Sequence, residues 1–277
     1  MFDAPATRLQ RVTGRAGVAL VAAPGRAARL DRLGQAGSAK AFLPRVHAAA
    51  PEVVFLNTAG GLTGGDSLTY AVNLGPGARA VATTQTAERA YRAAGGRARL
   101  DVRLTLGAGA ALDWLPQETI LYDASALDRR TRADLGPGAR LLMTEALVLG
   151  RQAMGERVAR LELDDWREVR RAGRPVLIEP LRLSDAALGD RPALLAGARA
   201  LATVALVAPG AEDAVGPVRA AIAGLPDGVA AAASGWDGKC VVRLRAADGW
   251  PLRRALVRLL AVLRGGAALP RVWQGAA

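Results

Sequence analysis

The sequence has one cysteine and one histidine among its 277 residues. The single cysteine, Cys240, excludes an internal disulfide and fits a reducing compartment. Zinc sites need clustered cysteine and histidine ligands, which two lone residues do not supply. Any Ser–His or Cys–His catalytic pair would depend on His47, which we expect at the surface or in a loop. These absences argue against metal storage and against histidine-based catalysis.

Long hydrophobic runs are also missing. The stretch Gly17–Ala23 follows several arginines, but it is short and rich in small residues, which predicts a β-strand rather than a signal segment. The stretch Ala193–Ala208 is interrupted by Arg199 and is too short to cross a bilayer. We therefore expect a cytoplasmic protein that does not bind membranes.

Positive charge is abundant but dispersed. The formal net charge is +12, and aromatic residues make up 4% of the chain. Lys40 and Lys239 are the two lysines, and the arginines are spread from Arg8 to Arg271 without a dense run. Nucleic-acid-binding surfaces normally cluster their cations. We therefore expect no nucleic-acid partner and favour an acidic protein partner, with a nucleic-acid-binding module as an open alternative.

A glycine-containing motif recurs at intervals of 32 and 29 residues: LGPGAR at Leu74–Arg79, LGAGAA at Leu106–Ala111 and LGPGAR at Leu135–Arg140. Apolar residues alternate with other residues before the first two copies, which is the period of a half-buried strand. Glycine provides the positive φ that a short reversal needs, and the prolines preset φ beside it. Each unit therefore predicts a strand, a tight turn and a second strand.

Units that cannot bury a face alone are expected to stack. We predict a mainly β protein whose residues 1–190 form a repeat-containing body of stacked strand–turn–strand units. Two arrangements fit this pattern equally well, a β-helical stack and layered sheets in an antiparallel sandwich. Residues 191–277 are expected to form an α+β portion packed on that body.

The C-terminal portion is predicted to have the order β-α-β-β-α, with two helices. Ala202–Ala208 has the pattern of a strand and Val215–Ala223 that of a short helix. Ala230–Trp236 and Cys240–Ala246 predict a hairpin around an Asp-Gly turn. Leucines at positions 252, 256, 259, 260 and 263 follow the spacing of one helical face.

The segment GGLTGGD (Gly60–Asp66) contains neither GxxxxGK[ST] nor GxGxxG, so it does not predict a phosphate-binding loop. Acidic residues near glycines leave one enzymatic alternative, a carbohydrate-active enzyme using paired carboxylates on a β scaffold. Its candidate acids are Asp66, Glu118, Glu145 and Glu156. Caps and turn hydrogen bonds are the ordinary role of such residues, and we expect no catalytic site.

Six segments resemble the recurring motifs of the urease accessory protein UreD (UreH) family, in the family's order. They are ARLDRLGQAGSAKAFLPR (Ala28–Arg45), FLNTAGGLTGGD (Phe55–Asp66), TTQTAERAYRA (Thr83–Ala93), LPQETILYDAS (Leu115–Ser125), LGRQAMGE (Leu149–Glu156) and LPRVW (Leu269–Trp273). Two departures lie in the third segment, where Arg89 stands in place of the usual lysine and Ala93 in place of a frequent serine. Arg89 keeps the charge, but arginine's planar fork is not equivalent to an ammonium group.

The resemblance implies a mostly β protein that is not an enzyme. Members of the family bind the accessory protein UreF, through it the GTPase UreG, and also the urease apoprotein. The complex delivers nickel to the urease active site, and an internal passage has been proposed as the route. No cofactor is implied, since nickel is present only in transit.

Nickel(II) binds imidazole and thiolate tightly and oxygen ligands more weakly. A chain with one histidine and one cysteine is therefore expected to contact nickel transiently, through carboxylates and carbonyls. Asp66, Glu118 and Glu156 are the candidates for weak nickel contact. The full set of partner or passage candidates is Gly60, Gly61, Gly64, Gly65, Asp66, Tyr91, Arg92, Gln117, Glu118, Arg151 and Glu156.

Overall fold

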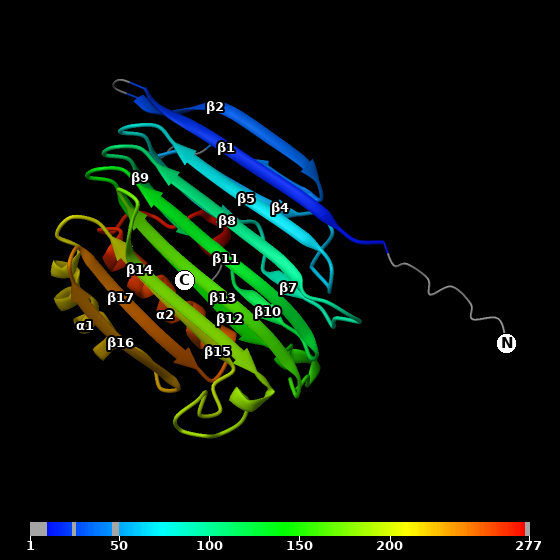
Figure 1. Ribbon diagram of the computed structural model, residues 1–277. Coiled ribbons are helices and arrows are strands. Elements are labelled where there is room, and N and C mark those ends of the chain that lie inside the picture. Colours follow the sequence, from blue (N-terminus) through cyan, green and yellow to red (C-terminus); the bar gives the residue numbers. More distant parts are fainter. Residues whose placement is uncertain (1–9, 24–25, 46–49, 275–277) are drawn as a thin grey trace.

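Successive strands in the middle of the chain alternate between two facing sheets (Figure 1). The computed structural model describes residues 10–23, 26–45 and 50–274. His47 lies outside these residues. The first sheet has the order β14 (Arg174–Ser184), β13 (Leu161–Arg171), β11 (Ser125–Leu135), β8 (Ala98–Leu106), β5 (Ser67–Leu74), β1 (Thr13–Ala23) and β2 (Arg26–Gly37).

The second sheet has ten strands. Its order is β16 (Val229–Trp236), β17 (Lys239–Ala246), β15 (Ala200–Val207), β12 (Arg140–Leu149), β9 (Ala111–Leu115), β6 (Arg79–Thr84), β4 (Glu52–Asn57) and β3 (Ala39–Phe42). Two short strands join it at the side, β10 (Thr119–Leu121) on β12 and β7 (Glu88–Ala90) on β10. The segment expected to form a strand at Gly17–Ala23 lies within β1.

Parallel pairing shows that the middle of the chain is a stacked coil. In the first sheet β5 pairs parallel with β8, and β8 with β11; in the second, β6 pairs parallel with β9, and β9 with β12. The chain completes about four turns of this coil. The β-helical alternative is therefore the one the chain adopts, with antiparallel strands added at both ends of the stack.

The repeated glycine motif forms the turns that stack from one coil to the next. Gly77 donates to the Ala108 carbonyl at 2.8 Å, and Gly109 donates to Pro137 at the same distance. Both glycines have φ near +65°. A Cβ on Gly136 would lie 2.7 Å from the Ala108 backbone nitrogen, so the close spacing of the turns requires glycine there.

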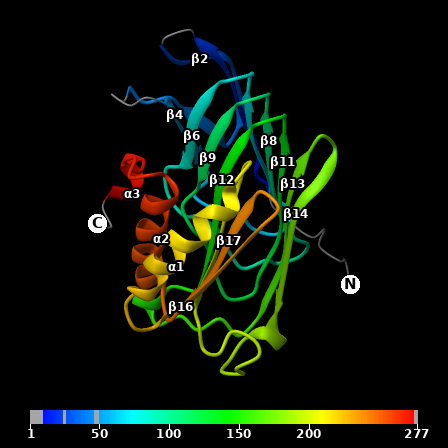
Figure 2. The same ribbon diagram turned by 90° about the vertical axis from the view of Figure 1, so that its left-hand side faces the viewer.

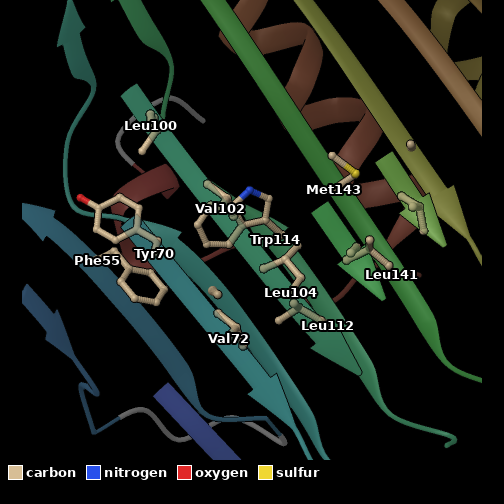
Figure 3. Close-up of a cluster of buried hydrophobic side chains, with 14 of the residues drawn as sticks. Phe55, Tyr70, Val72, Leu100, Val102, Leu104, Leu112, Trp114, Leu141 and Met143 are labelled. Atoms are coloured by element: carbon tan, nitrogen blue, oxygen red, sulfur yellow. The ribbon is translucent and has the colours of Figure 1, made fainter. Parts of the chain in front are cut away.

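The core lies between the two sheets and follows the alternation of the strands. Figure 3 shows part of it, where Phe55, Tyr70 and Trp114 pack among aliphatic side chains. The ring centroids of Phe55 and Tyr70 are 4.8 Å apart, and those of Phe55 and Trp114 are 5.9 Å apart. Leu104 and Leu112 are almost fully buried beside them.

The C-terminal portion has the predicted order, β15, α1 (Val215–Ala223), β16, β17 and α2 (Gly249–Leu263), followed by the short α3 (Arg271–Gln274). β15 pairs with β12, so these strands continue the second sheet. Figure 2 shows the helices on the outer face of that sheet. The predicted leucine stripe of α2 is buried there. The boundary at residue 190 stays a prediction.

The remaining regular elements are three 3₁₀ turns: η1 (Gln152–Met154), η2 (Asp185–Ala187) and η3 (Ala211–Ala214).

Cys240 is fully buried in β17, and burial raises the pKa of its thiol. Among the helices of the described residues, none has the length and apolar character needed to cross a membrane.

Candidate functional site

A buried network of charged side chains lies between the two sheets. Arg129 on β11 donates to both carboxylate oxygens of Asp165 on β13, at 3.0 and 2.6 Å. The same guanidinium lies 3.0 Å from Glu145 Oε2 on β12. Glu145 Oε1 accepts hydrogen bonds from Trp114 and Thr131. Arg129 thus ties the first sheet to the second.

Charges this deep are stable only when they are paired. Asp165 is fully buried and Arg129 is 2% exposed. Burial alone would raise the pKa of Asp165, but Arg129 and then Arg167 outweigh it and hold the pKa below its ordinary value. Burial likewise opposes the charged form of Arg129, yet Asp165 and Glu145 raise its pKa. The pairing therefore favours the charged forms of both Asp165 and Arg129.

Two cavities meet at Glu145. The first is lined by residues of both sheets, including Asn57, Glu88, Gln117 and Arg129, and its volume of about 40 Å³ holds roughly three water molecules. The second, of about 140 Å³, is also lined by Glu145, together with Arg167, Glu179, Thr203 and Arg243. Glu145 is therefore the lining residue that the two cavities share.

Unpaired donors face both cavities. Within the described residues, Gln117 Nε2 and Arg167 Nε are buried and have no hydrogen-bond partner. Gln117 lines the first cavity and Arg167 the second. Buried donors of this kind are normally satisfied by water. Water molecules in the cavities would therefore satisfy both donors.

Glu88 on β7 is the second carboxylate of the first cavity. Its oxygens accept from the Asn57 amide at 3.2 and 3.4 Å, and Oε1 also accepts from the backbone N–H of Arg89. Within the described residues it forms no ion pair, in contrast to Glu145. Burial raises the pKa of Glu88 to about 7, against the opposing hydrogen bond from Asn57.

At the surface, tyrosines and arginines from three loops form what we call the tyrosine–arginine cluster: Tyr91, Arg92, Tyr122, Asp123, Arg151 and Glu156. The rings of Tyr91 and Tyr122 meet edge to face, with centroids 4.9 Å apart. The Arg151 guanidinium lies 4.5 Å from the Tyr122 ring centroid. Arg92 pairs with Asp123 at 3.3 Å. Four of the predicted candidates thus meet on one surface: Tyr91, Arg92, Arg151 and Glu156.

The segment Gly60–Asp66, which we call the glycine loop, lies against this cluster. The Gly60 carbonyl accepts from the Tyr91 hydroxyl and from Arg89, each at 3.3 Å, and Gly60 also lines the first cavity. A Cβ on Gly61 would overlap the Tyr91 ring, so only glycine allows this approach. Gly64 packs in the same way against the backbone of Gly95.

Gly65 and Asp66 close the glycine loop. Gly65 has φ +90° and donates to the Arg97 carbonyl at 3.1 Å. Asp66 is 3% exposed, and each of its oxygens accepts one backbone N–H at 2.8 Å, from Val12 and from Thr63. Through these two hydrogen bonds, the Asp66 carboxylate holds the turn in place. Its contact with nickel stays a prediction.

Within the cluster, the Glu156 carboxylate also accepts hydrogen bonds from backbone N–H groups, as Asp66 does. Its Oε2 accepts from the Arg151 backbone at 3.1 Å and from Arg151 Nε at 2.8 Å. Its Oε1 accepts from the Asp123 backbone. Although burial acts to raise it, the pKa of Glu156 is lowered by the hydrogen bonds from Arg151 and Asp123.

Gln117 and Glu118 lie apart from the cluster, against helix α2. Arg253 of α2 donates to Gln117 Oε1 at 2.5 Å and to Glu118 Oε2 at 3.4 Å. The same guanidinium lies 4.8 Å from the Trp273 ring centroid. This pair therefore connects the C-terminal helices to the wall of the first cavity, where Gln117 also lies.

The four acids of the enzymatic alternative each have different hydrogen-bond or ion-pair partners. Asp66 and Glu156 bind backbone N–H groups, Glu118 pairs with Arg253, and Glu145 pairs with Arg129. No two of them share a hydrogen bond or a common ligand in the part of the chain that the structure describes. Within that same part, no group of three or more His, Cys, Asp or Glu side chains is placed to hold a metal ion.

Comparison with known proteins gives one consistent family. The sequence model of the family described as UreD urease accessory protein matches residues 12–274. The chain is 60% identical to the urease accessory protein UreD of Cereibacter sphaeroides (strain ATCC 17025 / ATH 2.4.3) over 272 residues, 98% of each chain. It is 55% identical to that of Dinoroseobacter shibae, covering 98% of this chain and 95% of the relative. It is 52% identical to the urease accessory protein UreD of Paracoccus denitrificans, and the match covers 99% of this chain and 96% of the relative.

Proposed function

The chain belongs to the UreD family of urease accessory proteins, and from that premise we propose that it is a non-catalytic scaffold for inserting nickel into urease. The observation that carries the proposal is the match across residues 12–274, which spans both sheets and α2. The scattered settings of Asp66, Glu118, Glu145 and Glu156 support a role without bond-breaking chemistry.

The proposed partners are UreF, UreG through UreF, and the urease apoprotein. The protein acts in the cytoplasm, where it meets the apoprotein, and its partners are proteins rather than nucleic acids or membranes. The surface offered to them includes the tyrosine–arginine cluster. Tyrosine and arginine are enriched among the residues that dominate binding at protein interfaces.

Nickel is the cargo of this complex, and it is not a resident cofactor of the chain. We propose that the two cavities that meet at Glu145 provide a polar passage for it. Glu88 and Glu145 line this route directly. Carboxylate and carbonyl oxygens bind nickel weakly, so they can release it to the next site. Asp66, Glu118 and Glu156 remain candidates for contacts outside the cavities.

A strain that lacks this chain tests the scaffold role. Urease is expected to be synthesised and folded at normal levels, but to contain little nickel and to show little activity. Urease amount is measured by immunoblot, nickel by mass spectrometry of the purified enzyme, and wild-type chain supplied in trans should restore both nickel and activity. Normal nickel content in urease from the deletion strain would refute the proposal.

The passage is tested in the same strain by filling the second cavity. Thr203 lines that cavity, so Thr203→Trp should block it and leave urease nickel-poor. Thr105→Trp is the matched control, because Thr105 is exposed on β8. If urease matured with Thr203→Trp as fully as with Thr105→Trp, nickel would not travel through this cavity.

A further inference from the structure

We propose that the tyrosine–arginine cluster binds a carboxylate-bearing segment of a partner protein. This inference rests on the proposed scaffold function and assigns a surface and a chemistry to it. The cluster is formed by residues 91–97, 122–124 and 150–160, three loops that lie far apart in the sequence. Three observations support the proposal: the order of its side chains, its charge, and an exposed apolar side chain beside them.

The side chains that would meet a partner are held in place before binding. Arg151 is fixed by Glu156 at 2.8 Å and by the Tyr122 ring, yet its side chain is 46% exposed. Tyr91 is 39% exposed, although its ring rests on Tyr122 and its hydroxyl donates to Gly60. Side chains that are already ordered lose little rotamer freedom on binding. The cluster is therefore exposed and preorganised.

The charge of the cluster selects an acidic partner. Its three loops hold five arginines and two carboxylates, a net charge of +3. All five arginines are exposed: Arg92, Arg97, Arg151, Arg157 and Arg160. Asp123 and Glu156 pair with Arg92 and Arg151, and Arg97 pairs with Glu162 beside the loops. Among the described residues, Arg157 and Arg160 form no ion pair and supply the excess positive charge. Planar guanidinium groups bind carboxylates through two parallel hydrogen bonds.

An apolar contact accompanies the charges. Met154 in the η1 turn is 72% exposed, the most exposed large hydrophobic side chain of the described residues. Methionine adapts its shape to irregular partner surfaces. A partner segment with carboxylates flanking an apolar side chain therefore matches the cluster in charge and in shape.

The aromatic rings favour protein over nucleic acid. Single-stranded nucleic acids bind by stacking bases on open aromatic faces. Tyr122 is 9% exposed and its ring is covered by Arg151, while Tyr91 packs against Tyr122. Tyr122 is thus closed to base stacking, and the single exposed ring of Tyr91 does not supply the successive stacking faces that single-stranded nucleic acids use.

The experiment measures binding of full-length chain to purified UreF and, separately, to urease apoprotein at 50 and 300 mM salt. Arg151→Glu and Arg92→Glu should each weaken one of these complexes by about tenfold or more, and should flatten its salt dependence. Tyr91→Ala should weaken the same complex by about tenfold. Arg170→Glu is the matched control, because Arg170 is 49% exposed, pairs with Glu168 and lies at the opposite end of β13 from the cluster. It should change affinity less than twofold.

The outcomes separate this inference from the scaffold function. If wild-type chain binds its partners and the cluster variants bind equally well, the cluster is not the docking surface and the scaffold function stands. If wild-type chain binds neither protein, the scaffold function itself fails.

A single-stranded RNA of about twenty nucleotides serves as competitor. Loss of RNA binding in Arg92→Glu and Arg151→Glu, with protein binding intact, would overturn the assignment to a protein. Thermal unfolding confirms that each variant is folded.

Discussion

Replacing Glu88 with glutamine tests the electrostatics of the internal cavity. In the folded protein, burial raises the pKa of Glu88 from 4.5 to about 7. One pKa unit corresponds to about 1.4 kcal/mol, so ionising Glu88 in place opposes folding by about 3 kcal/mol above pH 7. Glutamine has nearly the same shape and still accepts from Asn57, but it carries no charge.

The sign of the pH dependence follows from proton binding. Between pH 4.5 and 7 the folded state retains the Glu88 proton and the unfolded state has lost it. Stability therefore falls as pH rises through this window, and the full loss is reached above pH 7. We expect Glu88→Gln to match wild type near pH 4.5 and to exceed it by about 3 kcal/mol at pH 8.

Urea unfolding of both proteins at pH 4.5, 6, 7 and 8 measures this difference. Glu162→Gln is the control, because the Glu162 side chain is 62% exposed and lies outside the cavity. Its stability should follow that of wild type at every pH. If Glu88→Gln and wild type kept a constant difference across the whole range, Glu88 would not titrate near neutral pH and the reasoning would be wrong.

Two further substitutions test the buried network and the glycine loop. Arg129→Met leaves Glu145 and Asp165 without their shared cation and should lower the free energy of unfolding by about 3–5 kcal/mol at pH 7. Arg182→Met, at an exposed ion pair, should cost less than about 1 kcal/mol; equal losses in urea unfolding would contradict the network's role. Gly61→Ala places a methyl group on the Tyr91 ring and within 2.8 Å of the Arg89 carbonyl, and should cost about 1–3 kcal/mol. Gly60→Ala has open space and should cost about 1 kcal/mol through its φ of +76° alone, so a smaller loss for Gly61→Ala would refute the close approach.

Much of the fold could be predicted from local patterns in the sequence. The recurring LGPGAR and LGAGAA motifs predicted strand–turn–strand units, and the leucine spacing at 252–263 predicted α2. Both were confirmed, as was the hairpin around Asp237 and Gly238. Such patterns are local because a strand or a helix face is set by the residues that adjoin it.

The choice between a β-helical stack and a sandwich could not be made from the same patterns. Both arrangements bury the same alternating face of each strand. Only the pairing of β5 with β8 and of β6 with β9 distinguishes them, and those contacts join residues about thirty positions apart.

The sequence identified the family and singled out Gln117 and Glu145, which line the first cavity, but it missed Arg129, Asp165 and Glu88. Arg129 and Asp165 occupy the inward row of their strands, between Leu127 and Ala133 and between Leu163 and Val169. That alternation was a usable signal for a buried pair. The signal for Glu88 was weaker, since β7 has three residues and its partner Asn57 lies 31 positions away.

The sequence by itself determined the units of this protein: the strands, the glycine turns that allow close stacking, and the scarcity of histidine and cysteine. The tertiary structure decided what those units enclose. Glu145 lines two cavities, and Tyr91, Tyr122 and Arg151 meet on one surface, because the coil brings successive turns into register. Turn geometry is a property of neighbours in the chain, whereas the pairing of buried charges depends on contacts that exist only after the stack has formed.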